Sequence, residues 1–244
     1  MKIPRRLLHC AAQVSILILA LCAACTQATT HSLATSHPPE EEPGVIYHTF
    51  PEAFQPDRRY VFYVHGKIIE EQGVDAVSPL YGSYQFEEIL QSLAQAGFDV
   101  IGEVRPGPTD SDEYSDRLAD QIQTLLAAGV PANHITVVGF SKGAGITILT
   151  SSKLKNRELN FVLIAICGEE IDSDSALMIS GRILSLYEQS DPLGGSCETL
   201  AKRSPGVADF KEIEFSTGRE HGTFYGADPL WIDPVIEWIR SAVP

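Results

Sequence analysis

Short runs of aliphatic, aromatic and β-branched residues recur along this chain, and stretches with apolar residues at helical spacing separate them. The run YVFYV at 60–64 lacks polar alternation, which indicates a strand buried on both faces. We predict further strands at 99–104, 135–140, 161–166, 183–187 and 210–215, and helices at 86–96, 118–126, 144–153 and 229–242. Buried strands that alternate with helices predict an α/β fold, a mostly parallel sheet with helices on both faces. In such sheets the functional residues lie in loops that follow the strands.

Composition narrows the classes of protein to consider. Hydrophobic residues make up 44% of the 244 residues, enough for the core of one domain. The 32 Asp and Glu outnumber the 18 Lys and Arg, which gives a net charge of −14. A nucleic-acid-binding protein needs a basic face against the phosphates, so this class is excluded. The cysteines and histidines show no spacing typical of a zinc site, and we expect no metal and no organic cofactor.

The first 24 residues are typical of a secretory signal peptide. Lys2, Arg5 and Arg6 form a basic start without any acidic residue, and the apolar run VSILILALCAA follows at 14–24. A basic start and a short apolar run are the features of a leader that directs export. The run is shorter than the roughly 20 apolar residues that span a bilayer. We therefore expect an exported protein.

Residues 21–25 (LCAAC) resemble a bacterial lipobox, in which the last cysteine is lipidated and becomes the mature N-terminus. Cys22 stands where such boxes carry an aliphatic residue, so ordinary cleavage near Ala28 is the alternative. A lipidated Cys25 would anchor the protein to the membrane, since each buried methylene contributes about 0.8 kcal/mol. The polar, acidic segment 25–43 is typical of a flexible tether. We expect one folded domain at 44–244, either periplasmic and membrane-anchored or secreted.

One short motif points to catalysis. Residues 139–143 have the pattern G-x-S-x-G, with Ser141 between a predicted strand and a predicted helix. A serine on a sharp strand-to-helix turn needs small neighbours. The N–H groups at the start of the helix can stabilise negative charge on a substrate oxygen. The pattern predicts a nucleophilic Ser141, and a glycine-rich turn with a capping serine is the alternative.

A nucleophilic serine needs a base and an acid, and this topology uses the chain order Ser, acid, His. Of the seven histidines only His221 follows Ser141, and it lies in the loop after the predicted strand 210–215, so we predict His221 as the base. Asp191 follows the strand before that one, and as the acid it would accept the imidazole N–H. Alternatively it only starts a turn with Pro192. The competing acids, after the preceding strand, are Glu169, Glu170 and Asp172.

From Tyr60 to its end the chain resembles the α/β-hydrolase family. The resemblance rests on the order of strands and helices, on the G-x-S-x-G turn, and on His65-Gly66, which is similar to the HG turn after the third strand of that family. It implies an α/β-hydrolase fold in which His65 has a structural role. The implied site residues are Ser141, Asp191 and His221 as a catalytic triad, with the backbone N–H groups of Lys67 (or Ile68 in its place) and Lys142 as an oxyanion hole.

Many members of that family insert a lid after the strand that corresponds to 161–166. Here only residues 168–181 separate this strand from the next, which leaves room for one short helix. We therefore expect no large lid. An uncovered site favours a modest ester, amide or thioester over the substrate of a lipase that acts at an oil interface.

Other side chains fall near the expected site. Glu70 and Glu71 follow the HG turn and Arg105 follows the next strand, so all three are predicted at the pocket rim. Arg105 either grips a substrate carboxylate or pairs with a nearby acid. Cys167 and Cys197 form either a disulfide, which an exported protein permits, or two separate buried thiols.

The leading hypothesis is an exported serine hydrolase that cleaves a small-molecule acyl substrate through an acyl-enzyme on Ser141. A peptidase of the same fold is one alternative. A catalytically silent member of the fold that serves as an envelope binding protein is the other, because fold does not imply function.

Overall fold

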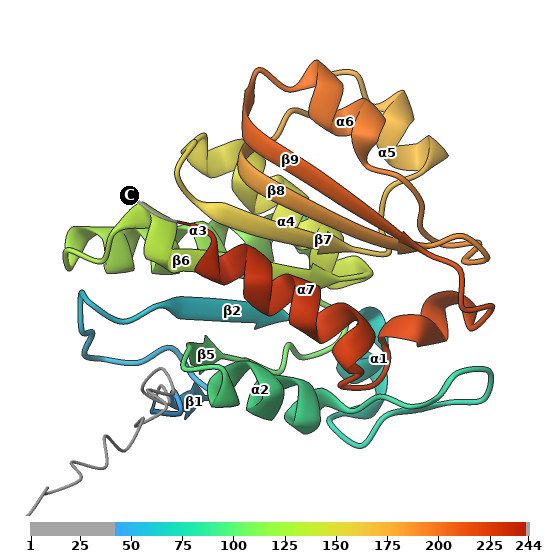
Figure 1. The fold of residues 1–244 in the computed structure, drawn as a ribbon, viewed down its shortest axis with the longest axis horizontal. Coiled ribbons are helices and arrows are strands. Elements are labelled where there is room, and N and C mark those ends of the chain that lie inside the picture. The colour runs from blue at the N-terminus through green and yellow to red at the C-terminus, as the bar shows by residue number, and fades with distance from the viewer. Residues whose placement is uncertain (1–41, 243–244) are drawn as a thin grey trace, which may run out of the picture. The chain divides into compact units, whose positions relative to one another are not determined.

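The computed structural model describes residues 42–242, which form a seven-stranded sheet with helices on both sides (Figure 1). The strand order is β1-β5-β2-β6-β7-β8-β9, and every neighbouring pair is parallel. Strands β3 and β4 form a separate antiparallel pair. The strands are β1 (Ile46–Tyr47), β2 (Tyr60–Val64), β3 (Val77–Ser78), β4 (Gly82–Ser83), β5 (Asp99–Ile101), β6 (Ile135–Phe140), β7 (Asn160–Ile164), β8 (Ser180–Glu188) and β9 (Gly206–Phe215). The α-helices are α1 (Lys67–Gln72), α2 (Phe86–Gln95), α3 (Ser111–Ala127), α4 (Lys142–Leu154), α5 (Glu169–Ser173), α6 (Glu198–Arg203) and α7 (Pro229–Arg240), and the 3-10 helices are η1 (Ala132–His134) and η2 (Glu220–Phe224).

The predicted signal peptide, Cys25 and all but the last two residues of the predicted tether lie outside the described residues. Within 42–242, no helix is both long and apolar enough to cross a membrane.

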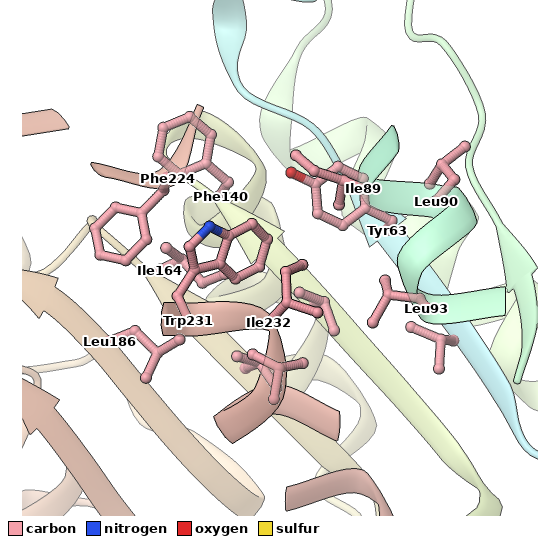
Figure 2. Close-up of a cluster of buried hydrophobic side chains, with 14 of the residues drawn as sticks. Tyr63, Ile89, Leu90, Leu93, Phe140, Ile164, Leu186, Phe224, Trp231 and Ile232 are labelled. Carbon is pink, nitrogen blue, oxygen red and sulfur yellow. The ribbon is translucent and has the colours of Figure 1, made fainter. Parts of the chain in front are cut away.

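Two hydrophobic clusters, one on each face of the sheet, hold the layers together. Alternate side chains of β2 belong to different clusters, Val61 and Tyr63 to one and Phe62 to the other. The first cluster packs against α2 and α7, and Figure 2 shows Trp231 of α7 among its members. The second packs against α3 and α4. The central strands are therefore covered on both faces, as their continuous apolar runs predict.

All the predicted strands and longer helices are present; β2 and β6 have the predicted bounds, and the other elements have at least one shifted end. Strand β5 ends at Ile101 instead of residue 104, and β9 begins at Gly206 instead of residue 210. Helix α3 begins seven residues before Leu118, because the side chain of Asp110 accepts hydrogen bonds from two N–H groups of its first turn. The short elements α1, α6 and β1 and the β3–β4 pair escaped prediction, since they are too short to show a period.

The parallel sheet brings the loops after several strands to one edge. The arrowheads of β2, β8 and β9 point to the right in Figure 1, toward α1. The residues that follow the strands at this edge include His65 after β2, Ser141 after β6, Asp191 after β8 and His221 after β9.

Candidate active site

Ser141 is the single residue between β6 and α4, and its backbone has φ 53° and ψ −122°. A positive φ is strained for a residue with a side chain, at a cost of about 1–3 kcal/mol. The flanking glycines are needed for space: a Cβ on Gly139 would lie 2.3 Å from Thr147 Oγ1, and one on Gly143 would lie 1.8 Å from the carbonyl oxygen of Val64. Helix α4 therefore begins in direct contact with the end of β2.

Asp191 and His221 form a buried hydrogen-bonded pair. His221 Nδ1 donates to Asp191 Oδ2 over 2.7 Å, and the two side chains are 5% and 0% exposed, respectively. The other carboxylate oxygen accepts the N–H of Leu193 at 2.9 Å, which fixes the carboxylate plane. Because a carboxylate only accepts, Nδ1 carries the proton and Nε2 of the neutral imidazole is an acceptor. The competing acids Glu169, Glu170 and Asp172 lie on α5, and Asp191 is the acid that the structure places on His221.

The His221 ring lies against the strand that leads into Ser141. Phe140, the residue before Ser141, packs on the imidazole with ring centroids 4.7 Å apart. Tyr81 and Tyr225 surround the same ring at 6.1 and 6.3 Å. Among the described residues the Ser141 hydroxyl makes no hydrogen bond with His221. In enzymes without substrate the bond between nucleophile and base is often long, so its absence is compatible with a Ser–His pair.

The HG turn is held by an imidazole that stays neutral. His65 Nε2 accepts the backbone N–H of Arg105 at 2.9 Å, so the ring proton is on Nδ1, which donates to the carbonyl of Gly66 at 2.8 Å. Burial and then the Arg105 charge lower the pKa of His65 to about 3. His65 is thus structural, as expected from the sequence, and it orients the peptide group that links Gly66 to Lys67.

Two helix N-termini meet at Ser141. Helix α1 starts at Lys67 and α4 starts at Lys142, and neither has a side-chain cap. The first N–H groups of a helix have no partner within it. A Cβ on Gly66 would lie 3.7 Å from Ser141 Cβ, so the turn before α1 is in contact with the serine.

Glu188, at the end of β8, is a positioning group that sequence analysis missed. Its carboxylate accepts the N–H groups of Thr217 and Gly218 at 2.9 and 3.2 Å and the hydroxyl of Ser190 at 3.0 Å. Burial alone would raise the pKa of Glu188, but these bonds lower it to about 2. The ionised carboxylate ties the loop that carries His221 to the loop that carries Asp191. A lone acid at a strand end gives no signal of this role.

Two hollows have walls that include Asp191 or chain neighbours of Ser141 and His221. A cavity of about 980 Å³ includes Lys142 and Asp191 in its wall, and one of about 370 Å³ includes Tyr81 and Glu220. The larger cavity is lined by apolar residues of α4 and the following loops, among them Ile148, Leu149, Ile166 and Leu193, and by the acids Glu169, Glu170 and Asp174. Within residues 42–242 no group of three or more His, Cys, Asp or Glu is arranged to hold a metal ion.

The residues that were predicted at the pocket rim, Glu70, Glu71 and Arg105, are absent from the lining of both hollows. Arg105 is 0% exposed in its side chain and pairs with Glu70 at 2.9 Å, so the interpretation of Arg105 as the partner of a nearby acid is confirmed. Placing Arg105 and Glu70 at the pocket rim was wrong, because both side chains are buried. Glu71 is exposed and pairs with Lys67 on the same helix at 3.1 Å.

Cys167 and Cys197 form a disulfide, the first of the two alternatives expected from the sequence.

The sheet order and the loops gathered at its edge define the α/β-hydrolase fold, and solved structures of that class superpose on the chain. A predicted CIB-like hydrolase from Thermoplasma acidophilum has a TM-score of 0.53 at 16% identity, covering 77% of this chain and 89% of that one. Arabidopsis thaliana SOBER1 has a TM-score of 0.52 at 12% identity, covering 77% of this chain and 100% of that one. An esterase of Rhizomucor miehei has a TM-score of 0.51 at 16% identity, covering 84% of this chain and 77% of that one. No protein-family model and no curated protein sequence matches the chain. Likeness at these identities establishes the fold, and the predicted fold class is confirmed.

Proposed function

We propose that the protein is a serine hydrolase that transfers an acyl group to water through an acyl-enzyme on Ser141. The observation that carries the proposal is the buried hydrogen bond of 2.7 Å between His221 and Asp191. This pair lies at the same edge of the sheet as the strained Ser141 turn, in the chain order of such triads. The hydrolase and esterase names of the structural neighbours agree with this function.

The geometry supports a definite division of roles. His221 Nε2 takes the proton of the Ser141 hydroxyl as Oγ attacks the acyl carbon, and Asp191 holds the imidazole tautomer and stabilises the imidazolium. The carbonyl oxygen becomes an oxyanion that accepts the backbone N–H groups of Lys67 and Lys142. Collapse expels the leaving group, which receives its proton from His221. Water, deprotonated by His221, then attacks the acyl-enzyme. The bond from the acyl carbon to Ser141 Oγ breaks, Oγ takes the proton back from His221, and the carboxylic acid product leaves.

The larger cavity, with Lys142 and Asp191 in its wall, is the candidate substrate pocket. Its lining combines apolar side chains with the acids Glu169, Glu170 and Asp174, so it favours an apolar group without negative charge. Between β7 and β8 the chain contains α5 and no large lid, which leaves the site open to water. These features favour a small carboxylic ester, thioester or amide.

The protein is further proposed to be exported and anchored through a lipidated Cys25. The basic start and short apolar run support export, and so does the bond between Cys167 and Cys197, since disulfides persist in oxidising compartments. Cleavage near Ala28 without lipidation is the alternative outcome.

The test is reaction of the full chain, as isolated from its expression host, with a fluorophosphonate probe, followed by intact mass and peptide mapping. We expect one probe per molecule on Ser141 and none on Ser141→Ala. The Tm of the variant should be unchanged within about 2 °C, because the partly buried hydroxyl makes no hydrogen bond among the described residues. Ser111→Ala is a matched control, since Ser111 lines the larger cavity, and it should label like wild type. The same intact mass reads the N-terminus, where a lipid adduct on Cys25 and a cleaved chain that starts near Ala28 differ.

A folded wild-type chain that does not react would contradict the proposed chemistry and favour an envelope binding protein. Label on another serine would remove Ser141 from the mechanism. With Ser141 labelled, Ser141-dependent turnover of short acyl esters supports the proposed substrate class, whereas turnover confined to peptides would identify a peptidase.

A further inference from the structure

Three charged side chains join the segments around Ser141: Glu70 and Arg105, both buried, and Lys142, which is 21% exposed. Glu70 of α1 is 2% exposed in its side chain and uses both carboxylate oxygens. Oε1 accepts from Arg105 Nε at 2.9 Å, and Oε2 accepts from Lys142 Nζ at 2.6 Å. Lys142 Nζ also donates to the carbonyl of Thr109 at 2.7 Å, and Arg105 donates to the carbonyl of His65.

A cluster of this kind contributes little to the stability of the fold. Removing charges from water carries a desolvation penalty that the attraction of a buried ion pair often fails to offset. Here two cations share one carboxylate, and Nη1 of Arg105 is buried without a hydrogen-bond partner. Burial raises the pKa of Glu70, but Lys142 and Arg105 lower it further, so the carboxylate is ionised at neutral pH.

The cluster connects helix α1 to the start of helix α4. Lys142 directly follows Ser141, and its backbone N–H is the first of α4. Glu70 lies on α1, whose first residue is Lys67. The bond between Glu70 and Lys142 therefore links, side chain to side chain, the two helices whose first N–H groups form the proposed oxyanion hole.

We infer that Glu70 is a positioning residue that sets the spacing of the two oxyanion donors, the backbone N–H groups of Lys67 and Lys142. This inference rests on the proposed serine hydrolase function. Loss of the Glu70 charge releases Lys142 from α1 and lets the two helix starts move apart. The donors then fit the tetrahedral oxyanion less well, while binding of the planar ester is little affected.

The experiment compares Glu70→Gln with Glu71→Gln in the full chain. Glu71 is the next residue of α1 and pairs with Lys67 on the surface, where both side chains are more than half exposed, 67% and 55% for Lys67 and Glu71. For Glu70→Gln we expect kcat on a short ester to fall about 10–100-fold, less than the about 10²–10³ for loss of a whole donor, with KM within about twofold. The affinity for an aryl trifluoromethyl ketone, whose serine adduct carries an oxyanion, should weaken by the same factor. Glu71→Gln should match wild type in all three.

Lys142→Met provides a second variant that keeps the backbone N–H and removes the ammonium group. It should lower kcat and ketone affinity together, and the double variant with Glu70→Gln should lose less than the product of the single losses, because both remove one contact. Unchanged kcat and ketone affinity in both single variants, with Ser141 still labelled, would overturn the inference and leave the proposed function intact. A rise in KM alone would also overturn it. A folded wild-type chain that reacts with neither ester nor fluorophosphonate would overturn the proposed function, and this inference with it.

Discussion

In the proposed mechanism the two imidazole nitrogens of His221 have different tasks, and the Asp191 carboxylate determines which nitrogen carries the proton. The 2.7 Å bond from Nδ1 leaves the lone pair of Nε2 available to a nucleophile. Asp191 is itself held by the N–H of Leu193, so it is oriented before any substrate binds. At this scale the decisive feature is the direction of one hydrogen bond.

Replacing the acid tests this directly. Asp191→Asn preserves size but presents an N–H or a weaker acceptor to Nδ1, which favours the wrong tautomer. We expect kcat to fall about 10⁴-fold, the size of the effect in a well-studied triad, with little change in Tm. Steady-state kinetics on a short ester measure it. The alternative acid on α5 supplies the opposing outcome: if Asp172→Asn produces the large loss and Asp191→Asn does not, Asp191 is not the triad acid.

At the scale of elements, α5 forms part of the wall of the larger cavity, and α6 packs against α5. The disulfide joins Cys167, after β7, to Cys197, directly before α6. The guanidinium of Arg203 on α6 donates to the carbonyls of Ile171 and Asp172 on α5 at 2.8 and 2.9 Å. The short helix α5 thus depends on α6 and on the disulfide for its position.

The disulfide should therefore contribute measurably to stability. Its two cysteines are 30 residues apart in sequence, and closing a loop of that size in the unfolded chain contributes about 3–4 kcal/mol. For a domain of this size we expect Cys197→Ser to lower Tm by about 6–16 °C. Thermal unfolding with and without reductant checks it: wild type should shift toward the variant in reductant, and the variant should not respond. A wild-type Tm that is indifferent to reductant would contradict a stabilising disulfide.

At the scale of the whole molecule, the buried titratable groups set how stability responds to acid. Burial and the charge of Arg105 lower the pKa of His65 to about 3 in the folded chain. In the unfolded chain His65 binds a proton below about pH 6.5, whereas in the folded chain it stays neutral until about pH 3. Burial also lowers the pKa of His134. Hydrogen bonds from Thr217 and Gly218 hold the ionised form of Glu188 and lower its pKa to about 2 in the folded chain. Below its ordinary pKa of 4.5 the unfolded chain therefore also binds more protons at Glu188 than the folded chain does.

The free energy of unfolding should consequently rise with pH. Between about pH 3 and 6.5 the unfolded state binds more protons than the folded state, and one such group gives a slope of up to about 1.4 kcal/mol per pH unit. Urea unfolding at a series of pH values measures this slope. His65→Gln, whose amide oxygen can replace Nε2 as acceptor for Arg105, should flatten the curve between pH 4 and 6.5. An identical slope in wild type and variant would show that His65 does not stay neutral.

The sequence by itself determined the alternation of strands and helices, the turn at Ser141 and the proposal of His221 as the base. The first two are local patterns of hydrophobicity and backbone geometry, and the third follows from chain order. Several other features were decided only by tertiary structure: the hydrogen bond of His221 to Asp191 and not to an acid of α5, the pairing of Arg105 with Glu70, the disulfide, and the contacts of Glu188. Each depends on which loops meet at one edge of the sheet. Residues far apart in the chain become neighbours there only when parallel strands are placed side by side, and no local pattern of residues encodes the distances and burial that result.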